Sequence, residues 1–524
     1  MFDISRRHFV VGAGAGFGAT LIGANATASP GGGRLSQNPF ALGVASGDPL
    51  SDSVILWTRL AVDPLDESGF AGMPARTVPV QWQVAEDPGM RRVVRRGTFR
   101  ARPENAHSVH VDVRGLRPGR EYWYRFKVMR WLSPIGRTLT APAPHEMPAS
   151  LAMAFASCAQ YEHGFFTAYR RLAQDHPDLV LHLGDYQYEY RANTYVSPDG
   201  NVRDHAGPET CDLASYRQRH AQYKADVDLQ SAHAVAPWLV VWDDHEIDNN
   251  WAAGVPENTK AEENNGTPAA FAARRRDAFR AYWENMPLRL PQPKGASFRI
   301  YRRTQWGRLA TFHMMDTRQY RDDQLYGDGW KAKGPEIDTP GRSMTGEAQE
   351  KWLLDGFTAS RQRWDILGQQ VFFAAQDADA GPGEKYSMDA WDGYRANRSR
   401  LTKGWTEAGV RNPVVLTGDV HKHWANDLKL DWSDPDSPVV GSELVCSSIT
   451  STGDGSHSTT SPNQRINPHL KFYNDDRGYV TTRITPEAMT AEFRSLDIVT
   501  KPGADAVTKA RFRIEDGVRG LQRA

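Results

Sequence analysis

Short runs in which hydrophobic and polar residues alternate dominate the first third of the chain, from about residue 40 to residue 140. Val80–Val84 and Val109–Val113 alternate with a period of two, and Val54–Trp57 is a short apolar run. Period-two alternation is typical of a β-strand that buries one face. The pattern therefore predicts antiparallel β-structure in this part of the chain.

A turn followed by an aromatic strand completes this first region. The segment Leu116–Tyr122 contains a Pro-Gly turn and ends on a tyrosine, and the aromatic residues 123–126 follow it directly. This arrangement resembles the tyrosine corner of fibronectin-like sandwiches. We therefore expect an antiparallel, fibronectin-like β-sandwich over residues 36–143, which ends in an Ala-Pro linker.

The apolar pattern changes after about residue 150. Continuous apolar runs recur there, and most of them end in an acidic residue; they occupy residues 151–158, 179–185, 238–244, 309–316 and 414–419. Runs without alternation suit strands that helices bury on both faces. An amphipathic helix at about 164–174 lies between the first two runs and predicts a βαβ unit. We expect an α/β domain over residues 150–517, with a mixed, largely parallel central sheet flanked by helices and closed by strands within 479–516.

Four side chains that can bind metals stand at the ends of these runs: Cys158, Asp185, Asp244 and Asp419. Ligands bind beyond the carboxyl ends of parallel strands, so such a sheet would bring the four residues to one edge. The alternative is that they are turn residues, since Asp is common where a strand ends. Their repetition, with histidines and asparagines beside them, favours a site.

Composition and charge exclude some partners. The 524 residues include 63 basic and 63 acidic ones, which cancel, so no overall field points to nucleic acid or to an anionic membrane surface. After the first 28 residues we predict no stable membrane span. The three cysteines leave at least one thiol unpaired, and a disulfide between Cys211 and Cys446 is one alternative to two structural thiols.

The first 28 residues carry an export signal. Arg6 and Arg7 precede a Gly/Ala-rich apolar run from residue 10 to 24, and Ala26-Thr27-Ala28 is a candidate cleavage site. Paired arginines followed by Phe9 resemble a twin-arginine signal, which is read by the twin-arginine export machinery. We expect removal of residues 1–28 and a periplasmic or secreted protein; an uncleaved membrane anchor is the alternative.

Three clusters in the second region carry the candidate chemistry: Gly184–Tyr188, Trp242–Asn250 and Gly418–His423. Carboxylates, imidazoles and amide oxygens are ligands for hard or borderline cations. Cations at such a site neutralise phosphate oxygens and provide hydroxide near neutral pH. The clusters therefore predict metal-dependent hydrolysis of a phosphoester.

The same clusters resemble those of the calcineurin-like metallophosphoesterases, and in detail the PhoD-like branch of alkaline phosphatases and phosphodiesterases. The usual Gly-Asn-His-Glu block is replaced by Asp243–Glu246, and Ser157–Cys158, Asp185–Tyr188 and Met315–Arg318 match this branch. The resemblance covers nearly the whole chain after the signal. It implies a metallophosphoesterase-like fold, an amino-terminal sandwich and phosphatase or phosphodiesterase activity.

The resemblance also implies a ferric ion with calcium partners, while zinc or another divalent metal stays an alternative. Cys158, Asp185, Tyr188 and His421 would hold the iron, and Asp185 would bridge to calcium. Asp244, Asn249 and Asp419 would supply calcium ligands, with the division among them left open. Thiolate and phenolate are anionic donors that suit a trivalent metal, and calcium prefers oxygen.

Several residues keep a second interpretation. Cys158 could be a small buried hydrophobe, and Tyr188 a structural aromatic. His245 could be a ligand or could orient one, and His423 is similar. Arg318 could clamp phosphate or form a salt bridge to a neighbouring carboxylate. We expect Asp185, His421, His245 and Arg318 to act in catalysis.

Other polar groups outside this set have supporting or surface roles in our interpretation. Glu246 and Asp248 are expected to be supporting or solvent-facing, and the run Arg274–Arg276 to be a solvated helix face. Residues 320–345 and 376–400 are rich in Gly, Asp, Trp and Tyr and lack clean periodicity. We expect them to form walls or a lid over the metals, with Trp391, Tyr394 and Arg395 either touching the leaving group or packing.

Three functions compete. The leading one is hydrolysis of small-molecule or lipid phosphomonoesters and phosphodiesters outside the cytoplasm, by metal-bound hydroxide or a bridging oxygen. A phospholipase D-like phosphodiesterase is the alternative within enzymes. A non-catalytic cell-envelope binding protein with a structural metal is the alternative from another class, although structural sites are usually closed.

Overall fold

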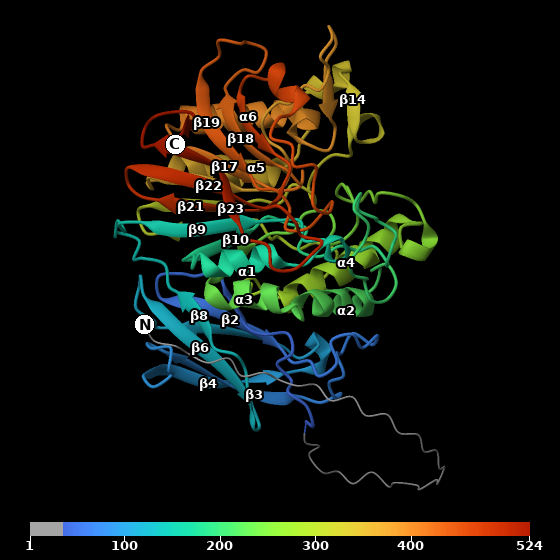
Figure 1. Ribbon diagram of the computed structural model, residues 1–524, viewed down its shortest axis with the longest axis vertical. Helices are drawn as coiled ribbons and strands as arrows, with labels where there is room; N and C mark the ends of the chain where they lie inside the picture. Colours follow the sequence, from blue (N-terminus) through green and yellow to red (C-terminus); the bar gives the residue numbers. More distant parts are fainter. Residues whose placement is uncertain (1–34) are drawn as a thin grey trace. The chain divides into compact units, whose positions relative to one another are not determined.

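The computed structural model describes residues 35–524, so the predicted signal at residues 1–28 lies outside the described residues. Two large sheets pack face to face, and helices cover their outer faces (Figure 1). One extensive core contains buried side chains from both sheets. This arrangement confirms the predicted α/β class with mixed sheets. None of the helices in the described residues is long and apolar enough to cross a membrane.

The larger sheet has ten strands, of which the central ones are parallel. β9 pairs with β10, β10 with β11, and β11 with β1, all in parallel, and antiparallel strands continue the sheet on both sides. In spatial order the strands are β24 (Gln522–Arg523), β23 (Val507–Glu515), β22 (Ala488–Leu496), β21 (Arg477–Ile484), β9 (Leu151–Ala156), β10 (Leu179–His182), β11 (Pro237–Val240), β1 (Ala45–Gly47), β2 (Ser53–Arg59) and β5 (Ser108–Arg114).

The second sheet has seven strands and a parallel centre formed by β13, β15, β17 and β19. In spatial order its strands are β12 (Arg302–Trp306), β13 (Ala310–Met314), β15 (Trp364–Gly368), β17 (Pro413–Thr417), β19 (Val439–Val445), β18 (His423–Lys429) and β20 (Leu470–Asn474). A parallel bridge between Ser157 and Ser448 joins the end of β9 to the segment after β19. The carboxyl ends of the two parallel centres therefore meet.

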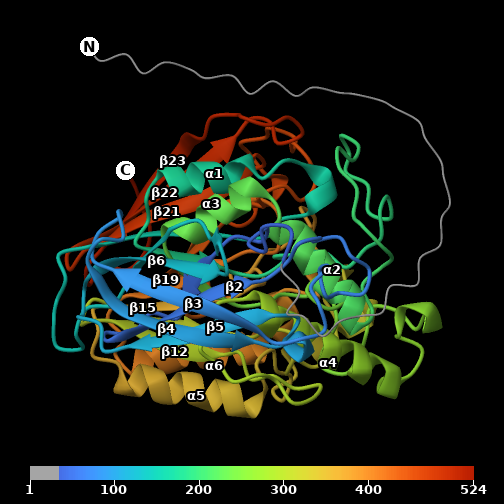
Figure 2. The ribbon, with the colours of Figure 1, turned by 90° about the horizontal axis from the view of Figure 1, so that it is seen from below.

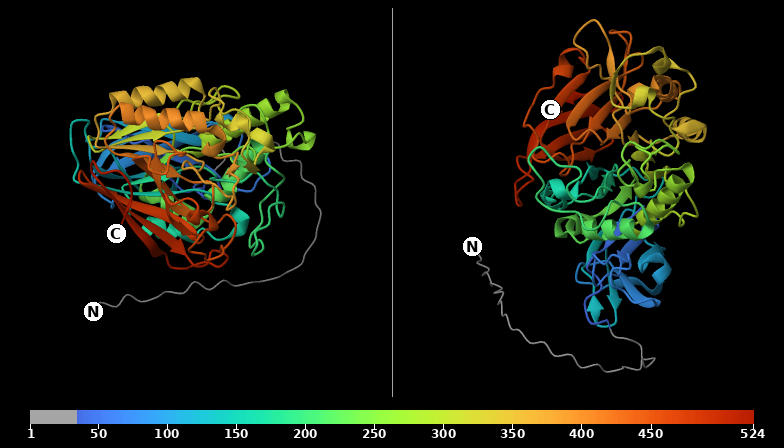
Figure 3. Two further views of the ribbon diagram at one scale, coloured as in Figure 1. Left: turned by 90° about the horizontal axis from the view of Figure 1, so that it is seen from above. Right: turned by 90° about the vertical axis from the view of Figure 1, so that its right-hand side faces the viewer.

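Helices close the outer faces of both sheets. α5 (Gly346–Ala359) and α6 (Arg395–Glu407) share a core with β15, β17 and β19 and lie along the outside of the seven-stranded sheet (Figure 3). The ten-stranded sheet is covered by α1 (Thr167–Gln174), α2 (Leu213–Lys224), α3 (Val227–Val235) and α4 (Pro268–Asn285). The helix expected from about residue 164 begins at Thr167, because Gly164, which ends the 3-10 turn of residues 161–163, has an extended backbone.

The amino-terminal region contains the predicted antiparallel strands, and its tyrosine corner is present. The Tyr122 hydroxyl accepts a hydrogen bond from the backbone N–H of Arg117, at 2.9 Å. One layer is a five-stranded sheet of β4 (Val93–Ala101), β3 (Val78–Ala85), β6 (Glu121–Val128), β7 (Trp131–Leu132) and β8 (Gly136–Leu139), which faces the viewer in Figure 2.

The other layer of this region is not a separate sheet. Strands β1, β2 and β5 continue the ten-stranded sheet, because Ser46 and Gly47 of β1 pair in parallel with Pro237 and Trp238 of β11. β1, β2 and β5 of the amino-terminal region thus share one hydrogen-bonded sheet with the parallel strands that lead to the site.

Two segments expected to be loops contain regular structure. β14 (Trp330–Ala332) and β16 (Lys385–Ser387) form an antiparallel ribbon, and short 3-10 turns flank it. Trp391 is buried and its indole N–H donates to Gln369, while the buried Tyr394 hydroxyl donates to the carbonyl of Asp322. Trp391 and Tyr394 therefore pack inside the protein, the second of the two alternatives for them.

The arginine run on α4 is only partly a solvated face. Arg274 is fully buried, and its guanidinium forms ion pairs with Asp248, at 2.9 Å, and with Glu209, at 3.3 Å. The expectation was wrong for Arg274, because its acidic partners lie in loops that the helix sequence does not reveal. Arg276 is exposed as expected.

Candidate metal centre

The carboxyl ends of five parallel strands deliver the polar residues of the site. Cys158 follows β9, Asp185 follows β10, Asp244 follows β11, Arg318 follows β13, and Asp419 follows β17. Strands from both sheets thus contribute to one edge, as the apolar runs ending in acids predicted.

Backbone strain is concentrated at this edge. Cys158, Asp185, Asp419 and His421 all adopt left-handed backbone conformations, with φ of 60°, 53°, 63° and 54°. A residue with a Cβ pays roughly 1–2 kcal/mol in this region of φ/ψ space, with Asp and Asn tolerating it best. Such strain persists where the surrounding structure holds it, and it is common at functional sites.

The four residues expected to bind iron converge. Ligand atoms of Cys158, Asp185 and His421 all lie within 4.8 Å of one another. The Tyr188 hydroxyl lies 2.9 Å from Oδ2 of Asp185 and 3.2 Å from Nε2 of His421. Ser451 Oγ, 2.7 Å from the Tyr188 hydroxyl, fixes the phenol from the other side. A thiol, a carboxyl, a phenol and an imidazole therefore meet at one point, where the first three side chains are buried and His421 is half-buried.

Two further groups of ligand atoms adjoin this point. Asp185, Asp244 and His245 form one group within 4.8 Å, and Asp243, Asp244 and Asp419 form another. Asp185 is shared between the group of Cys158 and His421 and the group of His245, and Asp244 is shared between the group of His245 and the group of Asp419. Shared carboxylates of this kind can bridge neighbouring metal ions.

The protein alone leaves these carboxylates unsatisfied. Oδ1 of Asp185, Oδ1 of Asp244 and Oδ2 of Asp243 are buried and have no hydrogen-bond partner. Burial raises the pKa of Asp185 well above its ordinary value, and the nearby Asp244 and Asp243 raise it further against the opposing effect of His245. Burial together with Asp243 raises the pKa of Asp419 in the same way. Buried anionic oxygens without donors fit a bound cation.

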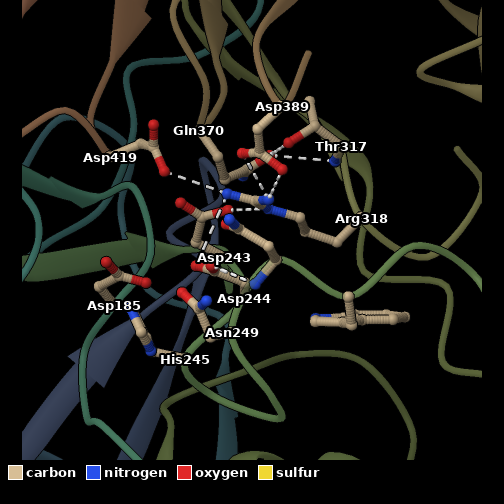
Figure 4. A network of polar contacts seen from close by, with 12 residues as sticks. Asp185, Asp243, Asp244, His245, Asn249, Thr317, Arg318, Gln370, Asp389 and Asp419 are labelled. Atoms are coloured by element: carbon tan, nitrogen blue, oxygen red, sulfur yellow. Dashed lines mark hydrogen bonds and ion pairs between the residues drawn. The ribbon is translucent and has the colours of Figure 1, made fainter. Parts of the chain in front are cut away.

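Arg318 compensates part of this negative charge. The side chain is fully buried, and its guanidinium contacts Asp243, both oxygens of Asp389 at 2.9 Å and Asp419 at 3.1 Å (Figure 4). Asp244 lies 3.6 Å away. With its donors directed at carboxylates, the geometry favours the salt-bridge alternative for Arg318 over a clamp on phosphate.

Two glutamates position the ligand loops. Glu246 accepts backbone N–H bonds from Asp185 at 3.1 Å, from Tyr186 at 2.7 Å and from Asp243 at 2.8 Å. Glu189 accepts from Nδ1 of His245 at 2.8 Å, assigned here as the protonated nitrogen, and from the backbone N–H of Asn249 at 2.9 Å. The supporting role expected for Glu246 is therefore the one that the contacts describe.

His245 is held between this support and the ligands. Its ring stacks on Tyr188 with 4.0 Å between ring centroids, and one ring nitrogen belongs to the group with Asp185 and Asp244. Burial opposes a charge on this imidazole, but Glu189, Asp244 and Asp185 outweigh it and hold the pKa of His245 well above its ordinary value. Both roles that the sequence left open for His245 are compatible with this position, because the ring lies beside the ligand group and is oriented by Glu189.

The site opens into a cavity of about 420 Å³, lined among others by Asp185, Asp244, Asn249, Asp419 and His421. Asn249 faces this cavity, although its side-chain amide donates to Glu257 at 2.7 Å. The predicted calcium ligands therefore border one space together with two of the predicted iron ligands.

The second histidine of the Gly418–His423 cluster turns away from the centre. His423 opens β18, and its Nδ1 accepts from the backbone N–H of Ser447 at 3.0 Å. Its ring packs against Phe493 with centroids 5.3 Å apart. Cys446 and Cys211 are both free thiols, so the disulfide alternative is wrong for this structure.

Sequence reasoning missed Asp243 and Asp389 as members of the site. Asp243 stands beside the predicted Asp244, and its adjacency to a strand end was the available signal. Asp389 comes from the 376–400 segment, where no local pattern marks it, and only its ion pairs with Arg318 and Arg321 reveal its place.

Comparison with known proteins gives consistent matches. The model of the PhoD-like phosphatase family matches residues 153–493, and that of the PhoD-like phosphatase amino-terminal domain matches residues 25–142. Alkaline phosphatase D of Bacillus subtilis (strain 168) is 46% identical over 529 residues, which cover 99% of this chain and 89% of that protein. A solved structure of PhoD superposes with a TM-score of 0.90 at 47% identity, covering 94% of this chain and 93% of that one.

Proposed function

Because the chain belongs to the PhoD-like phosphatase family and is a phosphoester hydrolase, we propose that it cleaves phosphomonoesters and phosphodiesters at the centre around Asp185. The observation that carries this proposal is the convergence of Cys158, Asp185, Tyr188 and His421 beside the acidic group of Asp243, Asp244 and Asp419. Five strand ends from two sheets meet there, at the wall of an open cavity.

The donor set supports a mixed metal centre. Cys158, Asp185, Tyr188 and His421 would hold ferric iron, since thiolate and phenolate are anionic donors that suit a trivalent ion. Asp244, Asn249 and Asp419 would hold calcium, which prefers oxygen ligands, and Asp185 would be shared between the two. When bound, these ions supply neutralisation of the phosphate oxygens and a hydroxide near neutral pH.

The chain's own residues prepare this chemistry. Glu246 fixes the backbone of Asp185 and Asp243, so that their carboxylates keep one arrangement before the substrate arrives. The buried guanidinium of Arg318 forms ion pairs with Asp243 and Asp419 and so compensates part of their negative charge. Glu189 occupies Nδ1 of His245, which leaves Nε2 as the nitrogen that can hold a proton for the departing oxygen.

Location and substrate scope extend the proposal. The twin-arginine-type signal in residues 5–28 supports export to the periplasm or the medium, where small-molecule or lipid phosphoesters would be the substrates. A phospholipase D-like specificity stays an alternative within this enzyme class. The alternative of a non-catalytic binding protein does not agree with the family to which the chain belongs.

The test compares Asp185→Asn with Asp365→Asn, a matched control. Asp365 is also buried, but it lies on β15, away from the centre, and its carboxylate bonds His313 of β13 at 2.9 Å. Turnover of p-nitrophenyl phosphate, its bis ester and phosphatidylcholine is measured together with metal content. We expect Asp185→Asn to lose at least about 100-fold in activity and to lose metal, because even changes behind a ligand cost 10–100-fold. Equal activity of the two variants would refute the assignment.

A further inference from the structure

A second, larger cavity of about 560 Å³ lies beside the metal centre. It meets the cavity described above at Asn250, Asp419 and His421, which line both. A group bound there would touch the centre at one end. Its size falls within the range of pockets that hold small molecules.

Aromatic side chains from separate elements form the wall of this second cavity. Phe372 meets Trp424 edge-on with centroids 5.7 Å apart, and Trp424 meets Tyr473 edge-on at 4.7 Å. Trp330, on the ribbon strand β14, completes the lining and is 42% exposed. An indole left this open at the mouth of a cavity can provide a flat apolar face for a ligand.

Apart from Asp419 of the metal centre, the carboxylates that line this cavity already have partners, and Asp328 accepts a hydrogen bond from the Asn250 side-chain amide at 2.6 Å. Asp389 is held by Arg318 and Arg321, and Asp392 by Arg398 at 2.8 Å. These acids therefore do not mark the cavity as a site for a cation.

Several donors, by contrast, are unused. Within residues 35–524 the Lys422 ammonium, the Trp424 indole N–H and the Tyr473 hydroxyl have no hydrogen bond or ion pair to protein, and all three residues line the cavity. Burial raises the pKa of Tyr473 to about 12, so its hydroxyl keeps its proton at neutral pH. Flat apolar faces combined with free donors complement a planar ring that carries acceptor atoms.

We propose that this cavity binds the alcohol portion of the substrate, and that the preferred phosphoesters carry a planar ring with acceptor atoms on that portion. The inference rests on the proposed function, because the phosphoryl group must occupy the adjoining metal centre. Trp330 and Trp424 would be specificity-determining residues, and Lys422 would contact acceptor or anionic groups of the ring.

The experiment separates the ring from the phosphoryl group. Methylphosphonate and phenylphosphonate carry the same phosphonyl group and are not hydrolysed, so their Kd values for the metal-loaded protein can be compared by calorimetry. We expect phenylphosphonate to bind about 10-fold more tightly, the size of one good aromatic contact. Trp330→Ala should reduce that ratio at least about twofold and leave the Kd of methylphosphonate unchanged.

A matched control and two contrary outcomes complete the design. Trp123→Ala, in the five-stranded sheet, removes a partly exposed tryptophan far along the sequence from both cavities and should change neither Kd. Equal Kd values of the two phosphonates in the unmodified protein would overturn the ring subsite alone. Failure of both phosphonates and of inorganic phosphate to bind would instead overturn the proposed function, and the subsite with it.

Discussion

The carboxylate of Glu246 holds the backbone of Asp185: its Oε2 lies 3.1 Å from the Asp185 nitrogen, in a residue whose φ is 53°. The same carboxylate accepts from the backbone of Asp243, after the neighbouring strand. One buried side chain therefore ties the ends of β10 and β11 together and supports the strained conformation of a metal ligand.

Replacing Glu246 by glutamine should lower kcat/KM by about 10–100-fold and weaken metal retention, because one acceptor oxygen becomes an NH₂ group that faces backbone N–H groups. Steady-state kinetics and elemental analysis measure both effects. Glu443→Gln is the matched control, since Glu443 is a buried carboxylate that accepts from the backbone of Phe373 and Ala374. A larger metal loss in the control than in Glu246→Gln would contradict the role of Glu246.

Tyr188→Phe should remove or strongly shift the visible absorption band of the metal-loaded protein. If Tyr188 binds ferric iron, the loaded enzyme is coloured by charge transfer from phenolate, and removing the hydroxyl removes or strongly shifts that visible band. Tyr186→Phe serves as the control, because the Tyr186 hydroxyl is directed at His233, at 2.8 Å, and not at the centre. Absorption spectra with iron analysis decide the matter; an active protein that contains zinc and no iron would refute the iron assignment.

Arg318→Met should destabilise the protein by about 3–5 kcal/mol, since it leaves Asp243 and Asp419 without their buried counter-charge and Asp389 with Arg321 alone. The midpoint of thermal unfolding measures the effect. Arg411→Met, which breaks an exposed pair with Asp516, should cost about 1 kcal/mol or less. An unchanged midpoint for Arg318→Met combined with a raised KM would favour the phosphate clamp instead.

Acid should destabilise the fold through His182. Burial, and secondarily Lys224, lowers the pKa of this histidine from 6.5 to about 3. Between these two pH values the unfolded chain binds a proton at His182 that the folded protein does not. The contribution of His182 to the free energy of unfolding is therefore fully present above pH 6.5 and is lost as the pH decreases toward 3. His182→Gln should reduce the slope of unfolding free energy against pH by about 1.4 kcal/mol per unit.

Urea unfolding at several pH values between 7.5 and 5 measures that slope. His145→Gln, at an exposed position, is the control and should leave it unchanged. The same slope in His182→Gln and in the unmodified protein would show that other groups govern the acid sensitivity.

The sequence predicts those features that local pattern determines. Apolar runs ending in Asp185 and Asp419 became parallel strands with both acids at one edge, because burial on both faces leaves a strand no polar positions until its end. The ligand set around Asp185 also follows from the resemblance of its motifs, and here its members converge.

Contacts between residues that lie far apart in the sequence could not be predicted from it. Arg274 reads as a surface residue in a run of three arginines, and only the folded chain brings Asp248 to it. Asp389 joins the site through Arg318, 71 residues away in the sequence. The parallel pairing of β1 with β11 joins Ser46 to Pro237 and leaves no mark in the alternation of either strand.

That pairing of β1 with β11 limits how the enzyme can be shortened. A chain that starts at residue 150 would lack β1, β2 and β5. β11 would then be an edge strand whose backbone N–H and C=O groups on that side have no partner strand. An exposed edge strand of this kind can pair with strands of other molecules. The shortened protein should therefore aggregate rather than yield a minimal phosphatase. In this architecture the amino-terminal region acts as a lateral seal for the strands that bear the reactive groups.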